Sequence, residues 1–488
     1  MTLLRAARVV PRTEVQDVRV VDGRIREAAP ALEPVRSEQV VDLAGRWVVP
    51  GLWDAHTHLG QWAAVRRRLD VSGARSVAEA AALVTERLRA ERHHTAAVLV
   101  GYGYRDVLWP EPPTAEALDR AARAAGRPEV GVVLVCADLH SGWFSTTAAA
   151  RLGVPPGVLR EEPWFAAVGL LEPDEGTLDA WVADAAAAAA TRGVVGVVDY
   201  ELADNLAAWQ RRMSAGTTGL RVEAGGGREH LHGGIPRGLA TRGAPAGPRE
   251  GFGLLTVGSL KVISDGSLNT RTAYCHDPYP GPDGPTSGVL NVPPEDLVPL
   301  MGKAARHGVH AAIHAIGDRA NGLALDAFEV SGALGSVEHA QLLDWDDLPR
   351  FARLGVVASV QPEHLVDDRG AIDAGWADRA ERCYPLRSLH DAGVELRFGP
   401  DAPVAPLDPW AAIASAVTRT RDGREPWFPE QALPVGAALA ASVRSRVAPG
   451  QPADLAVLDA DPLADPGLLR GMPVAATMLA GRWTHLTF

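Results

Sequence analysis

The feature that most constrains the fold is a phrase that recurs from residue 193 onward. A helix-like segment, a glycine and a short β-branched run appear as TRGVVGVVDY, RHGVHAAIHA, RLGVVASVQP and DAGVELRFGP, ending near residues 200, 315, 362 and 400. Glycine at a helix C′ position accommodates the left-handed backbone there, and a near-continuous apolar run suits a strand covered on both faces. The repetition therefore predicts βα units and a parallel sheet.

Eight strands of this kind are predicted along the chain. They are residues 52–58, 194–200, 219–225, 258–265, 309–315, 335–340, 355–361 and 394–401. Eight βα units that close into a barrel are the simplest architecture, with the chemistry expected where the strands end. The alternative is a doubly wound open sheet, which is disfavoured because no GxGxxG or GxxxxGK[ST] motif opens a helix.

The rest of the chain adds two regions to this barrel, which is assigned to residues 51–60 and 181–439. Alternating apolar and polar positions with turn signals predict a small composite β-sandwich from residues 1–50 and 440–488. Residues 61–180 are too long for a loop and carry helix and strand patterns, so they are predicted to form an inserted subdomain. The predicted fold class is α/β: a (β/α)8 TIM barrel, a β-sandwich from both termini, and an α/β insertion after strand 1.

Composition narrows the classes of function. A formal net charge of −12 argues against nucleic-acid binding, which needs clustered Lys and Arg. Three widely separated cysteines argue against a disulfide framework or a thiolate zinc site. The N-terminus lacks a signal-peptide pattern and no apolar window reaches about 18 residues, so we expect a cytoplasmic chain that spans no membrane. The expected partner is a small-molecule substrate, and a homodimer is one assembly considered.

Polar side chains follow five of the eight predicted strands. Strand alternation places the two histidines of GLWDAHTHLG on one face, and imidazole is a common ligand of divalent metals. Unrelated surface residues would not collect at the ends of five strands while the other strands lack them. The predicted metal ligands are His56, His58, Lys261, His314, His339 and Asp401.

Lys261 is a lone cation in an apolar stretch, and a buried ammonium costs several kcal/mol unless it is paired or neutralised. One interpretation is a salt bridge with Asp265. The other is that the neutral amine reacts with carbon dioxide to give a carbamate, whose two oxygens bridge two metals. A water bridging these ions would lose its proton near neutral pH. Asp401 can ligate one metal, take the proton from the attacking hydroxide and deliver it to the leaving amine.

This order of ligands resembles that of the amidohydrolase superfamily, and more narrowly the amidohydrolase family 3 branch, typified by N-substituted formamide deformylase. The motifs that carry the resemblance include VVPGLWDAHTHL, KVISDGSLNTRTA, HAIGDRAN and FGPDAPVAPLDPW. The resemblance implies a (β/α)8 barrel with a composite β-sandwich, a binuclear site that is often zinc, and hydrolysis of a C–N bond. It also implies that the strand-one histidines hold the more buried metal, the lysine bridges as a carbamate, and the histidines of strands five and six hold the second metal. The strand-eight aspartate would be both ligand and base.

Three further residues are predicted to contact the substrate. His140 and Trp143 match the HSxW phrase of the family, and Arg271 lies in the loop after strand four. Packing for the tryptophan and a solvated surface position for the arginine are the alternatives. His230 and His232 repeat the HxH spacing inside a glycine-rich segment, which we interpret as a loop rather than a second metal site.

The expected function is that of a metal-dependent hydrolase that cleaves a non-peptide C–N bond in an amide, N-formyl or N-acyl compound. Two divalent ions are expected, zinc first, with iron and manganese as alternatives. A lactonase, an esterase or another hydrolase on the same site is an alternative, as is a catalytically silent scaffold. Single-metal deaminases of the superfamily tend to lack the strand-four lysine, and this chain has one.

Overall fold

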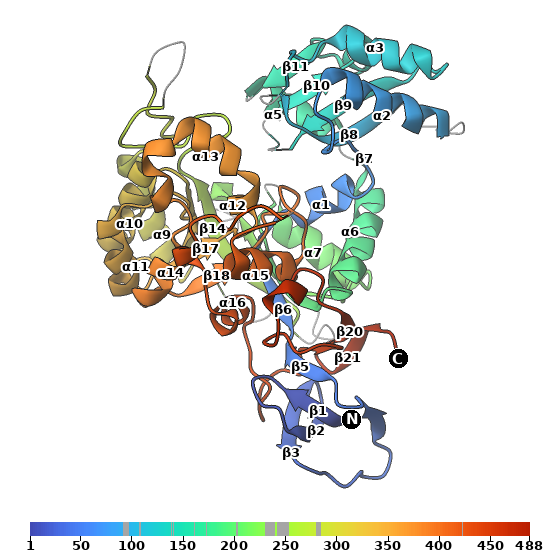
Figure 1. Cartoon of the computed structure of the whole chain (residues 1–488), viewed down its shortest axis with the longest axis vertical. Helices are drawn as coiled ribbons and strands as arrows, with labels where there is room; N and C mark the ends of the chain where they lie inside the picture. Colours follow the sequence, from blue (N-terminus) through green and yellow to red (C-terminus); the bar gives the residue numbers. More distant parts are fainter. Residues whose placement is uncertain are drawn as a thin grey trace. The chain divides into compact units, whose positions relative to one another are not determined.

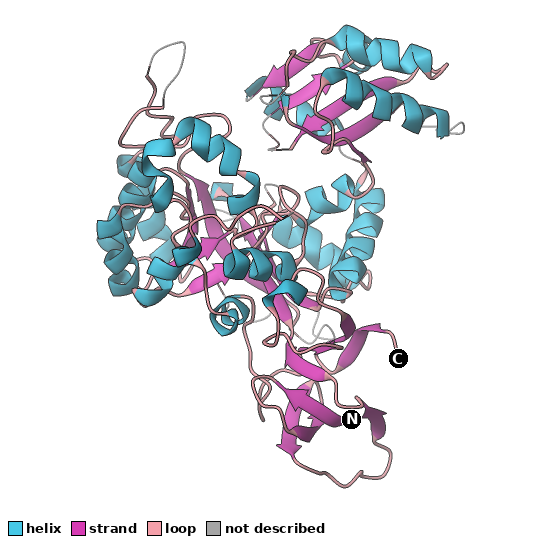
Figure 2. Cartoon of the chain, viewed as in Figure 1, coloured by secondary structure: helices cyan, strands magenta, loops and turns pink. Residues whose placement is uncertain are grey.

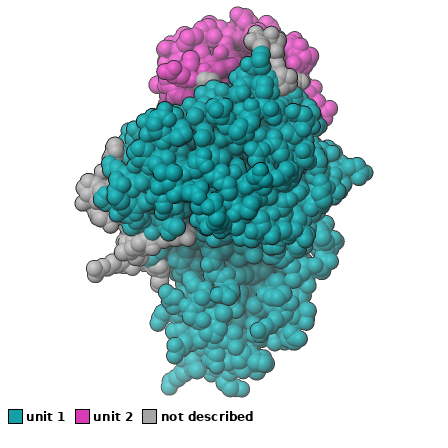
Figure 3. Space-filling view, turned by 90° about the vertical axis from the view of Figure 1, so that its left-hand side faces the viewer, with its two compact units in different colours: residues 1–59, 183–488 teal, residues 60–182 magenta. Residues whose placement is uncertain are grey.

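The computed structural model describes residues 1–90, 97–106, 109–137, 139, 141–160, 162–171, 173–201, 204–229, 240–241, 253–279, 285–421 and 423–488. These residues form two compact units, Met1–Leu59 with Ala183–Phe488, and Gly60–Val182 (Figure 3). Each unit is described by itself. Within the described ranges, no helix combines the length and the apolar character needed to cross a membrane.

The first unit is built on a sheet of eight parallel strands (Figure 1). In order they are β6 (Leu52–Thr57), β12 (Val194–Asp199), β13 (Arg221–Gly226), β14 (Leu255–Ile263), β15 (Ala311–Ala315), β16 (Gly335–His339), β17 (Val357–Val360) and β18 (Leu396–Phe398). The segment after β18 returns to β6, because a parallel bridge joins Thr57 and Ala402. The predicted strands and the predicted (β/α)8 barrel are therefore confirmed.

The glycines of the repeated phrase adopt the backbone that the phrase predicts. Gly193, Gly308, Gly355 and Gly393 have φ angles of 82°, 68°, 65° and 79°, which residues with a Cβ rarely adopt. Each glycine ends a helical segment and turns the chain toward the next strand. This left-handed turn is how one short phrase is used again for successive βα units.

Helices cover the outside of the barrel (Figure 2). They include α6 (Glu175–Ala190), α7 (Asn205–Ser214), α9 (Pro294–Arg306), α10 (Asp318–Ser331), α11 (Leu348–Leu354), α14 (Leu386–Asp391), α15 (Pro409–Thr418) and α16 (Val435–Ala441). Phe328 of α10 and Phe351 of α11 belong to one buried cluster with Ile313 and Val337 of the strands. Burying each such side chain contributes about 1.5–3 kcal/mol, so the barrel wall is a hydrophobic core.

A second sheet in this unit joins the two ends of the chain. Its strands run in the order β21, β20, β19, β5, β1, β2, β3, with β4 on β1. Their bounds are β1 (Thr2–Val9), β2 (Val15–Val21), β3 (Arg24–Ala29), β4 (Gln39–Asp42), β5 (Trp47–Pro50), β19 (Leu455–Leu458), β20 (Val474–Leu479) and β21 (Arg482–Leu486). The antiparallel pairing of β5 with β19 joins the N-terminal strands to the C-terminal ones, in agreement with the predicted fold class.

The second unit follows the first barrel strand in the chain and is an α/β layer. Its sheet runs β11 (Gly157–Arg160), β10 (Ser141–Phe144), β9 (Gly131–Cys136), β8 (Val98–Tyr104), β7 (Leu69–Asp70). Its helices include α2 (Val77–Ala90), α3 (Ala115–Ala124), α4 (Thr146–Leu152) and α5 (Glu162–Val168). Valines and alanines of β9, α2 and α3 give this unit a core of its own.

Asp454 ties the terminal sheet to the barrel. Its Oδ2 accepts a hydrogen bond from Nε of Arg221 at 2.6 Å, and its Oδ1 accepts from Nη2 of Arg221 at 3.1 Å. The same Oδ1 accepts from the backbone N–H of Ala480 at 2.8 Å. Asp454 is only 3% exposed, so these donors offset the cost of burying its carboxylate.

We expect Asp454→Ala to lower the free energy of unfolding by about 3 kcal/mol, because the partly buried guanidinium of Arg221 loses its partner. Urea unfolding followed by circular dichroism measures this change. Asp459→Ala is the control, since the side chains of Arg46 and Asp459 are 27% and 47% exposed. It should cost less than about 1 kcal/mol, and equal losses in the two variants would contradict the interpretation.

Candidate metal centre

The site begins at the carboxyl end of β6, where two backbone hydrogen bonds fix the exit of the strand. The N–H of His56 donates to Oδ1 of Asp54 at 2.9 Å, and the N–H of Leu59 donates to Oδ1 of Asp199, also at 2.9 Å. Asp54 and Asp199 are fully buried. They hold the HxH segment in an extended conformation up to the helix that begins at Leu59, so the positions of His56 and His58 are set by the barrel.

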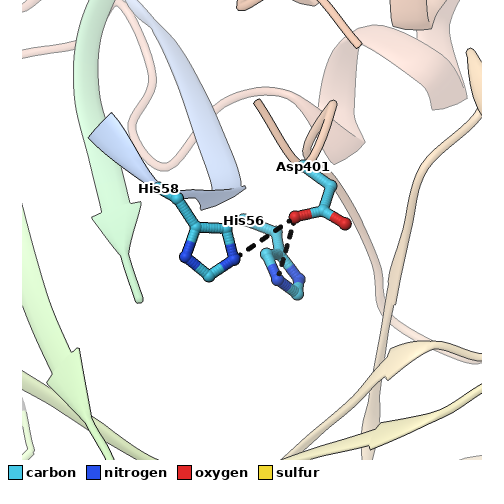
Figure 4. A group of neighbouring side chains, drawn as sticks. All are labelled: His56, His58 and Asp401. Carbon is cyan, nitrogen blue, oxygen red and sulfur yellow. Dashed lines mark ion pairs between the residues drawn. The ribbon is translucent and has the colours of Figure 1, made fainter. Parts of the chain in front are cut away.

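Three of the predicted ligands meet at the seam where the barrel closes (Figure 4). Oδ1 of Asp401 lies 3.5 Å from Nε2 of His56 and 3.5 Å from Nε2 of His58. The seam itself is made by the N–H of Asp401, which donates to the carbonyl of His56 at 2.9 Å. The first and last strands of the barrel thus place their ligands together.

The other three predicted ligands adjoin this group. Nζ of Lys261 on β14 lies 2.9 Å from Nε2 of His56. The ring of His339 on β16 lies 5.1 Å from that of His56, measured between centroids, and 4.4 Å from the ring of His314 on β15. The structure therefore brings all six predicted side chains into one continuous cluster.

The donor set fits a divalent metal ion. One donor atom from each of His56, His58 and Asp401 lies within 4.8 Å of the other two. Two ligands of a tetrahedral ion of the size of zinc lie about 3.4 Å apart, given metal–ligand bonds of about 2.1 Å. The two separations of 3.5 Å match that spacing.

Two imidazole nitrogens in the cluster also call for a ligand. Nδ1 of His58 and Nδ1 of His339 are buried, and neither has a hydrogen-bond partner among the described residues. A buried nitrogen without a partner is costly, so such atoms normally bind an ion or a water molecule. The unpartnered Nδ1 of His339 is independent of the spacing at Asp401 and favours a ligand in the cluster. Nδ1 of His58 does not bear on the ion beside Asp401, because Nε2 is the nitrogen of His58 that lies near Asp401.

The backbone is strained at two of the six positions. His339 has a φ of 75° and Asp401 a φ of 56°, in the left-handed region that costs a residue with a Cβ about 1–2 kcal/mol. Such residues persist where the surrounding structure holds them, and they concentrate at functional sites. Here the left-handed backbone changes the direction of the His339 side chain at the end of β16 and of the Asp401 side chain where the barrel closes.

Burial sets the protonation states of the cluster. Burial lowers the pKa of Lys261, and together with the charge of Lys261 it lowers the pKa of His314 to about 3. Burial alone would raise the pKa of Asp401, but the neighbouring imidazoles of His56 and His58 hold it well below its usual range. Burial acts against the charged form of His58 too, but its contact with the Asp401 carboxylate raises the pKa of His58. The neutral amine, the neutral imidazole and the ionised carboxylate are the forms in which such groups bind metals.

The alternative interpretation of Lys261, a salt bridge with Asp265, does not describe the structure. The Asp265 carboxylate accepts hydrogen bonds from the backbone N–H groups of Tyr274, Ile316 and Gly317 at 2.9 to 3.3 Å. It is fully buried, and burial raises its pKa to about 7. Asp265 anchors the loops after β14 and β15, while Lys261 faces His56.

Asp265 also orients one predicted ligand. Nε2 of His314 lies 3.4 Å from Oδ1 of Asp265 and 3.3 Å from the carbonyl oxygen of Gly266. Nε2 of His314 is therefore held by the loop after β14. The sequence suggests Asp265 only as a salt-bridge partner of Lys261, so this orienting role comes from the structure.

Glu338 is a site residue that the sequence pattern did not reveal. Its Oε2 lies 2.7 Å from Nδ1 of His56, and it directly precedes His339 on β16. The available signal was a carboxylate inside a buried strand, which is costly unless it is paired.

The residues predicted to contact the substrate are divided between the two units, unlike the predicted metal ligands, which all belong to the first. Trp143 is fully buried on β10, where its Nε1 donates to the carbonyl of Thr114 at 2.9 Å. Arg271 lies exposed in the loop after β14, with a φ of 57°. His140, His230 and His232 lie outside the described residues. The roles of His140, Trp143 and Arg271 in substrate binding stay predictions.

Comparison with known proteins identifies the family. The model of the family described as "Amidohydrolase family" matches residues 39–485. The chain belongs to this family. Membership indicates a hydrolase and implies a divalent metal, which agrees with the donor set.

Three similar proteins extend this result. YtcJ, a putative amidohydrolase of Bacillus subtilis (strain 168), is 33% identical over 246 residues, which are 46% of this chain and 46% of that protein, so the alignment spans less than half of either. N-substituted formamide deformylase of Arthrobacter pascens is 24% identical over 91% of this chain and 89% of its own. The crystal structure of an uncharacterized metal-dependent hydrolase from Pyrococcus horikoshii OT3 has a TM-score of 0.76, at 25% identity over 96% of this chain and 99% of that one.

Gly399 offers a test of the seam. A Cβ at this position would lie 2.4 Å from the backbone nitrogen of His56 and 2.8 Å from Oδ1 of Asp54. We expect Gly399→Ala to push the segment that carries Asp401 away from β6, lowering metal affinity at least about tenfold and the free energy of unfolding by about 1–3 kcal/mol. Competition with a chromogenic chelator measures the affinity.

Gly436→Ala is the matched control for this substitution. Gly436 lies in α16, and a Cβ there would meet no heavy atom within 4 Å. It should leave metal affinity unchanged. Wild-type affinity in Gly399→Ala would show that the closeness of the two strands does not set the ligand spacing.

Proposed function

We propose that this protein is a binuclear metal-dependent hydrolase that cleaves a non-peptide C–N bond, in an amide or an N-formyl or N-acyl compound. The observation that carries the proposal is the convergence of six metal-binding side chains from five barrel strands, with ligand spacings that suit a metal. Similarity to N-substituted formamide deformylase over 91% of the chain supports the choice of bond.

Each predicted ligand takes a role in this proposal. His56 and His58 would hold the first ion, His314 and His339 the second, and Lys261 would bridge the two as a carbamate. Two divalent ions, zinc first, would supply Lewis acidity that polarises a carbonyl and makes water nucleophilic near neutral pH.

Asp401 is the proposed general base and general acid. Its carboxylate accepts a proton from the attacking water and donates it to the nitrogen of the leaving amine, so amide and water give a carboxylic acid and an amine. The neighbouring imidazoles keep Asp401 ionised, which is the form that can accept a proton. The barrel seam fixes its position, because its own N–H is bonded to the carbonyl of His56.

The carbamate requires a neutral amine, and the structure favours one at Lys261. The lone pair of Nζ attacks carbon dioxide, a C–N bond forms, and one proton is released. Burial lowers the pKa of Lys261 and so increases the neutral fraction. The sequence contains one other lysine, Lys303 in α9.

This scarcity of lysine makes the carbamate directly testable. Protein equilibrated with ¹³C-bicarbonate and a divalent metal should show a carbamate carbon resonance that Lys303→Arg retains and Lys261→Arg loses. Metal analysis should find close to two ions per wild-type chain, fewer than one in Lys261→Arg, and two in Lys303→Arg. A wild-type metal content and full activity in Lys261→Arg would refute the bridging role.

A substrate panel tests the reaction. Metal-loaded protein should hydrolyse N-formyl or N-acyl amines faster than lactones or phosphotriesters, with amine release as the readout. Asp401→Asn should lower kcat/KM by about 10³-fold, whereas Asp408→Asn, which changes the N-cap of α15, should lower it less than about twofold.

Each other outcome of the panel contradicts the proposal in a different way. Preferential turnover of lactones or phosphotriesters would keep a hydrolase and change the bond. An intact two-metal protein that hydrolyses no class of compound would favour the silent scaffold.

A further inference from the structure

We propose that Glu338 is the positioning residue of the metal centre, which fixes the tautomer and the ring orientation of His56. This inference rests on the proposed metal site and adds to it a residue that is not itself a ligand. The Glu338 carboxylate contacts His56 through one oxygen and the hydroxyls of Ser336 and Tyr200 through the other. Glu338 also lines a cavity in the barrel.

The first contact sets the tautomer. Oε2 of Glu338 lies 2.7 Å from Nδ1 of His56, and each side chain is 1% exposed. An ionised carboxylate can only accept, so Nδ1 carries the proton and donates it. Nε2 is then left with its lone pair, and it is the atom that lies 2.9 Å from Nζ of Lys261 and 3.5 Å from Oδ1 of Asp401.

The second oxygen of Glu338 is held as well. Oε1 accepts a hydrogen bond from the hydroxyl of Ser336 and a longer one, at 3.5 Å, from the hydroxyl of Tyr200. The Tyr200 ring also packs edge-on against His56, with 5.0 Å between the centroids and 71° between the planes. Because both carboxylate oxygens have partners, the carboxylate cannot rotate without losing contacts, and the imidazole plane is fixed with it.

The backbone of β16 makes this arrangement possible. Consecutive strand residues point to opposite faces, so Glu338 and His339 would not both reach His56 in a regular strand. The φ of 75° at His339 breaks that alternation. As a result, Glu338 bonds His56 from one side while the ring of His339 lies 5.1 Å away.

A second glutamate, Glu223, lines the same cavity in the barrel as Glu338 and serves for comparison. The cavity has a volume of about 190 Å³, and its lining includes Glu338, Tyr200, Glu223 and Arg444. Glu223 on β13 forms an ion pair with Arg444. Glu338 bonds an imidazole of the cluster instead, so Glu223 is the matched control: a glutamate of the same cavity whose charge is paired with a guanidinium.

The tautomer of His56 can be read in metal-free protein. Histidine-selective ¹⁵N labelling, with His56 assigned from a His56→Gln variant, should show a protonated Nδ1 and an unprotonated Nε2 in the wild type and in Glu223→Gln. Glu338→Ala should move the proton to Nε2 or give a mixture of tautomers. An unchanged Nδ1–H signal in Glu338→Ala would overturn the proposal, whatever reaction the protein catalyses.

Metal affinity gives the second readout. Glu338→Gln keeps the volume and one acceptor oxygen and should weaken metal binding roughly tenfold, Glu338→Ala roughly 100-fold, and Glu223→Gln less than about threefold. Wild-type affinity in folded Glu338→Ala would overturn the proposal. If that variant does not fold, Ser336→Ala replaces it. Removing the hydroxyl that bonds the Glu338 carboxylate should weaken metal binding measurably, by up to roughly fivefold.

The two readouts separate this proposal from the proposed function. A tautomer change and a loss of metal affinity in a protein that hydrolyses no tested compound would support the role of Glu338 and reject the hydrolase. If the protein hydrolyses the expected substrates but the tautomer of His56 does not depend on Glu338, the hydrolase is supported and the role of Glu338 is rejected.

Discussion

The closure of the barrel between its first and last strands is the constraint on which the site depends. The N–H of Asp401 bonds the carbonyl of His56, the N–H of His58 bonds the carbonyl of Ala402, and a side chain at Gly399 would collide with the same backbone. Hydrogen bonds that complete the sheet therefore also set the distances among three predicted ligands. A change that opened the seam would disturb the fold and the metal centre together.

The cluster shows how a barrel interior accommodates groups that are costly to bury. Each ionisable member loses hydration, and burial lowers the pKa of the lysine and of three of the histidines, His56, His314 and His339. Hydrogen bonds then return part of that cost, through Glu338 for His56 and through the loop after β14 for His314. Metal ions would offset much of what remains, because neutral imidazole and ionised carboxylate are the forms that bind them, and such binding stabilises the folded state.

The sequence predicted the parts of the structure that repeat or alternate. The glycine of each phrase marked a helix end, the apolar runs marked the eight strands, and the polar residues at their ends are the side chains that the structure brings together as predicted ligands. Glu338 could not be found in this way, because regular alternation places it on the opposite face of the strand from the next residue, His339. The backbone of His339 is left-handed instead, and both side chains lie beside His56. The position of Trp143 is a second example. The tryptophan matches a family phrase, but the phrase does not show that its side chain is buried on β10, because that depends on how the second unit packs.

The use of lysine argues for a special role at position 261. Of the 48 Lys and Arg residues in the chain, two are lysines, so arginine supplies nearly every cation. Where a partly buried cation pairs with a carboxylate, as Arg221 does with Asp454, an arginine is used. A guanidinium remains charged at any relevant pH, whereas an amine can become neutral when it is buried. The proposed carbamate would account for lysine at the centre of the cluster, because it requires the neutral nucleophilic form, which a salt bridge would not impose.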